Sequence, residues 1–139
     1  MFETVVIATD GSTSAGRAVE TALDIAERFG AEVHVLSVLN DANGEHEAEV
    51  RDALARLERE HDYPVTTVVE RGDPAAVIQR YATDVDADLV ATGTRGRDSP
   101  YSYHLGSVAE TVVHDCPIPV LTVRQLAGEV ESEMAADAE

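Results

Sequence analysis

The sequence has no lysine and no tryptophan, and it holds one cysteine, two phenylalanines and four tyrosines among 139 residues. Without lysine, the chain cannot form the phosphate-binding loop that ends in Gly-Lys-Ser or Gly-Lys-Thr. A single cysteine excludes an intramolecular disulfide and a cysteine metal cluster, and we expect Cys116 to be a packing residue. Apolar runs stay well below the roughly 20 residues that a membrane helix needs, so no membrane span is expected.

Positive charge is also scarce. Ten arginines stand against 27 acidic residues, which gives a formal net charge of −17. This excess makes nucleic acid and anionic membranes poor partners. An acidic, lysine-free composition resembles that of halophilic proteins, so we expect a protein adapted to concentrated salt; an ordinary acidic protein is the alternative. The first ten residues carry an acid where a signal peptide would be basic, which favours a cytoplasmic location.

Short apolar runs alternate with amphipathic segments along the chain. Apolar β-branched runs are typical of strands buried on both faces of a parallel sheet, and apolar residues three and four positions apart predict helices. The predicted strands span residues 4–9, 33–39, 65–70, 89–92 and 120–124, and the predicted helices span residues 12–29, 45–60, 74–85 and 106–115. The alternation predicts one α/β domain with an open parallel sheet and a ligand site at the carboxyl ends of its strands.

Particular residues are expected to mark the ends of these helices. The hydroxyls of residues 12–14 could cap the first helix, and Gly30 follows it, where a left-handed residue commonly ends a helix. Asp73 followed by Pro74 predicts a capped start for the third helix. The histidines show no metal-ligand spacing and are expected to be ordinary residues.

The segment that follows the fourth predicted strand is rich in glycine. Gly93, Gly96 and Gly106 are joined by Thr94 and by Ser107, which opens a predicted helix. Glycines allow backbone N–H groups to approach an anion closely, and the N–H groups at a helix start add a favourable dipole. The segment therefore suits a polyphosphate, although glycine-rich loops also serve only as turns.

Three motifs in this chain resemble those of the universal stress protein family. Gly93, Gly96, Gly106 and Ser107 fit the pattern of Gly-x-x-Gly, nine residues and Gly-Ser, which looks like that family's ATP-binding signature. Residues 8–12, Ala-Thr-Asp-Gly-Ser, resemble the end of its first strand, and residues 116–124, Cys-Pro-Ile-Pro-Val-Leu-Thr-Val-Arg, resemble its closing stretch. The resemblance implies a single domain over residues 1–124, followed by an acidic tail at 125–139 that we expect to be disordered.

The resemblance also implies an architecture and a site. It implies a Rossmann-like fold, similar to the adenine nucleotide α-hydrolases, with strand order 3-2-1-4-5 and helices on both faces. ATP, with Mg²⁺ held through its phosphates, would lie between the first and fourth strands. Ala8 and Thr9 would line the base and sugar, Asp10 would accept from the ribose hydroxyls, and the Val38 backbone would meet the adenine edge. The phosphates would be surrounded by Gly93, Thr94, Arg95, Gly96, Gly106, Ser107 and Val108.

Family members pair through their last strand, which implies a homodimer formed by Val120, Leu121, Thr122 and Val123. Between Gly96 and Gly106 the chain departs from the family's small and leucine-like residues, because Asp98, Tyr101, Tyr103 and His104 lie there. An acid beside a triphosphate requires a bridging divalent cation.

The resemblance favours a regulatory nucleotide-binding protein of the stress response over an enzyme. A slow ATPase or nucleotidyl transferase is one alternative, but transfer chemistry needs a positioned base and strong charge stabilisation, and the chain has neither lysine nor a His-x-Gly-His signature. A flavodoxin-like FMN site at residues 10–14 is another, although few aromatics are available to stack on a flavin. A nucleotide-independent interaction module is the third, and the glycine signature argues against it.

Overall fold

The computed structural model describes residues 2–10, 16–40, 46–93 and 107–123. Within these ranges lie, in chain order, β1 (Thr4–Ala8), α1 (Gly16–Phe29), β2 (Glu32–Leu39), α2 (Glu47–Glu60), β3 (Thr66–Arg71), α3 (Pro74–Asp84), β4 (Leu89–Gly93), α4 (Ser107–Asp115) and β5 (Val120–Val123). The strands form one sheet in the order β3-β2-β1-β4-β5, and every neighbouring pair is parallel. This confirms the predicted fold class and strand order.

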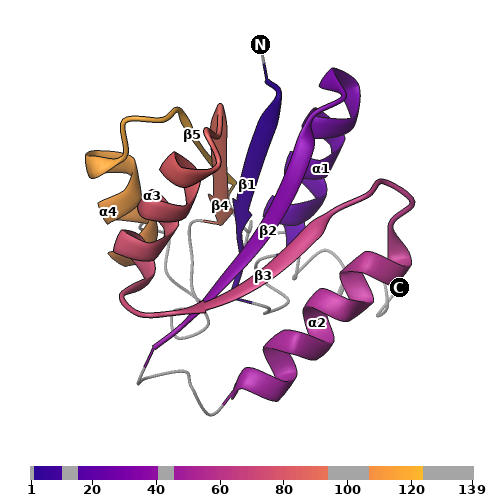
Figure 1. Ribbon diagram of the computed structural model, residues 1–139, viewed down its shortest axis with the longest axis horizontal. Coiled ribbons are helices and arrows are strands. Elements are labelled where there is room, and N and C mark those ends of the chain that lie inside the picture. Colours follow the sequence, from indigo (N-terminus) through magenta and orange to yellow (C-terminus); the bar gives the residue numbers. More distant parts are fainter. Residues whose placement is uncertain (1, 11–15, 41–45, 94–106, 124–139) are drawn as a thin grey trace, which may run out of the picture.

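The sheet is the middle layer of the molecule, with α1 and α2 on one side and α3 and α4 on the other (Figure 1). Alternate residues of each strand belong to two separate hydrophobic clusters. Val33 and Val35 pack towards α1 and α2, whereas Leu36 and Val38 pack with α3 and α4. Burial of each such side chain contributes about 1.5–3 kcal/mol, so both faces of the sheet are needed to hold the domain together.

The predicted helix ends are confirmed where the structure describes them. Gly30 adopts a left-handed φ of 66° directly after α1. Asp73 caps α3, because its carboxylate accepts a hydrogen bond from the backbone N–H of Ala76 at 3.1 Å, and Pro74 is the first residue of the helix. The expected cap at residues 12–14 and the tail at 125–139 lie outside the described residues.

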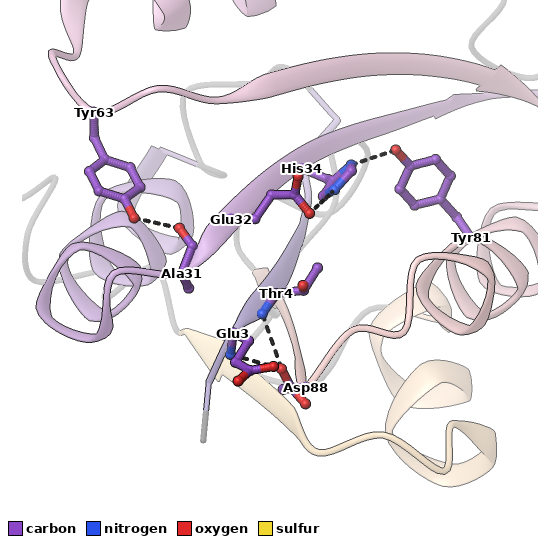
Figure 2. A network of polar contacts seen from close by, with 8 residues as sticks. All are labelled: Glu3, Thr4, Ala31, Glu32, His34, Tyr63, Tyr81 and Asp88. Carbon is purple, nitrogen blue, oxygen red and sulfur yellow. Dashed lines mark hydrogen bonds and ion pairs between the residues drawn. The ribbon is translucent and has the colours of Figure 1, made fainter.

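Polar side chains join elements near the amino ends of the strands, as Figure 2 shows. Oδ2 of Asp88 accepts from the backbone N–H groups of Glu3 and Thr4 at 2.8 and 3.0 Å, which fixes the start of β1 beside β4. The hydroxyl of Tyr63 donates to the carbonyl of Ala31. These contacts stabilise the edge of the sheet opposite to the predicted site.

On the α3 side of the sheet, Nδ1 of His34 lies 2.7 Å from the hydroxyl of Tyr81, and its Nε2 lies 3.3 Å from Oε2 of Glu32 (Figure 2). Partial burial is the main cause that raises the pKa of Tyr81, and the nearby carboxylates of Glu70 and Glu32 raise it further. The tyrosine therefore stays protonated and can act as a donor to His34. In the described ranges, none of the helices has the length and apolar character required to cross a membrane.

Candidate functional site

The carboxyl ends of β1, β2 and β4 meet at one edge of the sheet. Ala8, the last residue of β1, is paired with Leu36 of β2 on one side and with Thr92 of β4 on the other. Thr9 and Asp10 follow β1 directly, and both are partly buried. Because ligands of open α/β sheets bind outside the carboxyl ends of the strands, this edge is the candidate site.

At this edge β2 extends beyond β1. Pairing between the two strands ends at Ala8 and Leu36, whereas β2 remains paired with β3 as far as Leu39 and Arg71. The N–H of Thr9 donates to the carbonyl of Leu36 at 2.9 Å, and Ser37 donates its hydroxyl hydrogen to the carbonyl of Thr9 at 2.6 Å. Val38 therefore lies in the part of β2 that projects past the end of β1.

Three of the site residues predicted from the sequence share one apolar environment. Ala8 and Val38 are buried in the hydrophobic cluster on the α3 and α4 face, and Val108 of α4 packs against the same cluster. The end of β1, the end of β2 and the first turn of α4 thus contribute to one cluster, although they are separated by up to 100 residues in the chain. The candidate site therefore borders the hydrophobic core on the α3 and α4 face of the sheet.

The end of β4 supplies the other side of the candidate site. Gly93 is the last residue of the strand and is paired with Val123 of β5. The hydroxyl of Thr92, a buried side chain, donates to the carbonyl of Gly93 at 3.2 Å. Ser107 is exposed at the start of α4, and its carbonyl accepts from the Thr111 hydroxyl at 2.9 Å within the helix.

Of the predicted phosphate-binding residues, the structure describes Gly93, Ser107 and Val108. Thr94, Arg95, Gly96 and Gly106 lie outside the described residues. Among the residues that the structure does describe, no three His, Cys, Asp or Glu side chains are grouped so that they could hold a metal ion.

A cluster of charged side chains lies beyond Val38, at the outer edge of the sheet. Arg71, at the end of β3, pairs with Glu47 at the start of α2, and Nε of Arg51 lies 2.9 Å from the same carboxylate. The hydrogen bond from Arg51 is the main cause that lowers the pKa of Glu47, and the charge of Arg71 adds to it. Glu47 therefore stays ionised and holds α2 against the end of β3.

The prediction from the sequence missed two residues of this edge, Ser37 and Thr92. They are the two buried polar side chains among the residues described here. A polar residue within an otherwise apolar strand is a signal that was present in the sequence, because burying a hydroxyl without a hydrogen bond is costly.

Comparison with known proteins supports the same fold. The sequence matches the universal stress protein family over residues 1–124. A universal stress protein of Thermus aquaticus is 36% identical over 137 residues, covering 89% of this chain and 100% of the relative. A universal stress protein of Methanocaldococcus jannaschii is 32% identical over 142 residues, covering 90% of this chain and 84% of the relative.

Solved structures of universal stress proteins are also similar to this chain. A universal stress protein crystallised in complex with cAMP is 30% identical, has a TM-score of 0.71, and is matched over 90% of this chain and 98% of its own. The protein UspA of Lactobacillus plantarum is 25% identical, with a TM-score of 0.76 over 88% of this chain and 98% of its own. With its sheet order, its helices on both faces and a match to the family over residues 1–124, which include every described residue, this protein belongs to the universal stress protein family.

Proposed function

We propose that the chain binds an adenine nucleotide, ATP with Mg²⁺, at the carboxyl edge of β1, β2 and β4, and that it acts as a regulatory protein of the stress response. The observation that carries this proposal is that Ala8, Val38 and Val108 share one apolar cluster, beside Asp10 and at the same edge as Gly93. The apolar cluster suits the base, the carboxylate of Asp10 suits the sugar, and the end of β4 at Gly93 suits the chain of phosphates.

Each residue of the site has a chemical reason for its role. Ala8 and Thr9 line the base and sugar, and the backbone of Val38 meets the polar edge of adenine. An ionised carboxylate offers only acceptors, so Asp10 suits the ribose hydroxyls, which can donate. The phosphates lie against Gly93, Thr94, Arg95, Gly96, Gly106, Ser107 and Val108, where backbone N–H groups at the start of α4 favour an anion.

The relative that was crystallised with cAMP supports an adenine nucleotide as the ligand class. It leaves open which nucleotide this chain prefers, because cAMP has no free 3′-hydroxyl and only one phosphate. The four glycine-signature residues and Arg95 favour ATP, since a longer phosphate chain can use more N–H donors and the arginine charge. Mg²⁺ would be held through the phosphates and would offset the charge of Asp98.

The direct test is to purify the protein in molar KCl with Mg²⁺, denature it, and identify the released nucleotide by chromatography. Asp10→Asn removes the carboxylate charge that we propose to accept hydrogen bonds from the ribose hydroxyls. Asp52→Asn is the control, because it removes the same charge from an exposed position on α2. We expect near-stoichiometric ATP from the parent and from Asp52→Asn, and a clear loss from Asp10→Asn.

Gly106→Val extends this test to the phosphates, because a β-branched side chain would crowd the backbone there. Inorganic phosphate released from added ATP would reveal slow hydrolysis and favour the enzyme alternative. If the parent releases no nucleotide and added ATP leaves its melting temperature unchanged, nucleotide binding is wrong and the interaction module is the better reading.

The protein is also proposed to form a homodimer through β5. In the described sheet β5 pairs with β4 alone, so its outer edge can accept a second copy. The backbone N–H of Val90 donates to the carbonyl of Pro119, so the backbone polar groups of the odd-numbered residues in and next to β5 point towards β4. The backbone N–H of Thr122, an even-numbered residue, therefore points to the open edge. Thr122→Pro should therefore halve the mass measured by light scattering, while circular dichroism stays unchanged. A parent that is already monomeric would contradict the proposal.

A further inference from the structure

The side chain of Ser37 is a polar group in an apolar setting. Its neighbours on the same face of β2, Val35 and Leu39, belong to the cluster that packs under α1 and α2, and Ser37 itself is only 1% exposed. A valine or alanine at this position would suit the cluster equally well. The hydroxyl therefore needs a reason, since burying it without a hydrogen bond would cost stability.

The reason is the carbonyl of Thr9, which accepts from the Ser37 hydroxyl at 2.6 Å. This contact lies where the regular pairing of β1 with β2 ends, because the last paired residues of the two strands are Ala8 and Leu36. The Thr9 N–H donates to the carbonyl of Leu36 at 2.9 Å. Both backbone polar groups of Thr9 are thus bound to β2, one by the backbone and one by a side chain.

A hydrogen bond to the Thr9 carbonyl fixes the orientation of the whole peptide group between Thr9 and Asp10. The carbonyl of Thr9 and the N–H of Asp10 belong to one peptide group, and a peptide group is planar. Ser37 therefore sets the plane from which the Cα of Asp10 projects, at the point where the chain leaves the sheet. Asp10 is the second residue after β1, so the way in which the end of the strand is held bears directly on its direction.

We infer that Ser37 is a positioning residue, whose hydroxyl holds the Thr9–Asp10 peptide so that the Asp10 carboxylate faces the ribose hydroxyls of the bound nucleotide. This inference rests on the proposed function, because it assigns the ribose to Asp10. It goes further by giving a buried residue outside the nucleotide contacts control over one specific feature of the ligand, its 2′ and 3′ hydroxyls.

The test compares two ligands, ATP and 2′,3′-dideoxy-ATP, which differ only in those hydroxyls. Binding of each is measured by calorimetry in molar KCl with Mg²⁺, for the parent and for Ser37→Ala, Asp10→Ala and Val35→Ala. Val35→Ala is the matched control, because Val35 lies on the same strand and face, is 0% exposed, and has no contact to Thr9 through a hydroxyl. Urea unfolding of each variant gives its stability.

The parent should bind ATP about 10-fold to 100-fold more tightly than the dideoxy ligand, as hydrogen bonds to a charged carboxylate allow. Asp10→Ala should abolish this preference, and Ser37→Ala should reduce it to about 3-fold or less, while its affinity for the dideoxy ligand changes little. Val35→Ala should keep the parent's preference even though it unfolds at lower urea.

The outcomes separate the two claims. A parent that binds neither ligand overturns the proposed function and this inference with it. A parent that prefers ATP, together with a Ser37→Ala protein that keeps the same preference, overturns the inference alone. Equal weakening of both ligands in Ser37→Ala would show a general structural role and would also overturn it.

Discussion

Nε2 of His61 lies 2.8 Å from Oε1 of Glu20, so the residue that follows α2 is joined to α1. Nδ1 of the same ring lies 3.0 Å from the carbonyl of Leu57 in the last turn of α2. Both partners are acceptors without a hydrogen to donate, so only the doubly protonated imidazolium can satisfy both. The carbonyl of Leu57 is the main cause that raises the pKa of His61, and Glu20 adds to it, whereas partial burial opposes them.

This geometry predicts that the protein loses stability as the pH rises above the ordinary pKa of histidine. The pKa of His61 is higher in the folded chain than in the unfolded chain, where it is about 6.5. The stabilisation is therefore complete below the unfolded value and is lost as the pH rises through the folded value. We expect a loss of less than about 1 kcal/mol, because Glu20 is largely exposed.

The measurement is the free energy of urea unfolding between about pH 5.5 and 8.5, a range that brackets the ordinary histidine value. His61→Gln should reduce the change in the free energy of unfolding across this pH range. His114→Gln, which changes an exposed histidine at the end of α4, should leave that change as it is in the parent. A pH profile that is the same for the parent and for His61→Gln would contradict the assigned role of His61.

A second prediction concerns the cap of α3. Asp73→Ala removes the carboxylate that accepts from the Ala76 N–H, and should lower the free energy of unfolding by about 1 kcal/mol. Asp84→Ala removes the same charge from the last residue of α3, where an acid opposes the helix dipole, and should be neutral or slightly stabilising. Equal effects of the two substitutions on the urea midpoint would mean that net charge, rather than the cap, accounts for the change.

A third prediction contrasts two glycines. Gly72 has a φ of 142°, and a Cβ placed there would lie 2.9 Å from Cγ2 of Val77. Gly30 has a φ of 66°, and a Cβ there would meet open space. Gly30→Ala should cost about 1 kcal/mol of backbone strain, and Gly72→Ala should cost more because strain and overlap add. Thermal unfolding should therefore place Gly72→Ala below Gly30→Ala, and the reverse order would contradict the reasoning.

The alternation of strands and helices could be predicted from the sequence because its periodicities are local, whereas the order of the strands was implied by the resemblance to the universal stress protein family. In β2 the run of residues 33–39, apolar except for His34 and Ser37, supplies Val33 and Val35 to one face and Leu36 and Val38 to the other, which is the pattern of a strand covered on both sides. The caps at Gly30 and Asp73 were equally local. The positions of Ala8, Val38 and Gly93 at one edge followed from the order of the strands.

The contact that holds the Thr9 carbonyl at the site and the contact that joins α2 to α1 could not be predicted in this way. The partner of Ser37 is 28 residues away, and the partner of His61 is 41 residues away. Neither distance has a period that a sequence pattern can reveal, because each depends on where two strands end or on how two helices pack. Residues 94–106, which carry most of the expected phosphate contacts, lie outside the described ranges, so their role remains a prediction.

The last prediction concerns salt. With a formal net charge of −17 and no lysine, repulsion among acidic side chains opposes the compact state. Raising KCl from about 0.1 M to about 1 M shortens the screening length from about 10 Å to about 3 Å, so the melting temperature should rise over this range. Salt also weakens attractive pairs such as Arg28 with Asp24, but both side chains are mostly exposed and such a pair contributes at most about 1 kcal/mol.

Repulsion should therefore decide the sign of the salt effect. Screening is nearly complete by about 1 M, so the rise should be steep at low salt and level off, and NaCl should act like KCl. Lowering the charge by the double substitution Asp52→Asn and Glu110→Gln, both at exposed helix positions, should reduce the salt dependence. A melting temperature that is indifferent to KCl would favour the ordinary acidic protein. A rise confined to concentrations above 1 M would indicate a general salting-out of apolar surface instead of relief from repulsion.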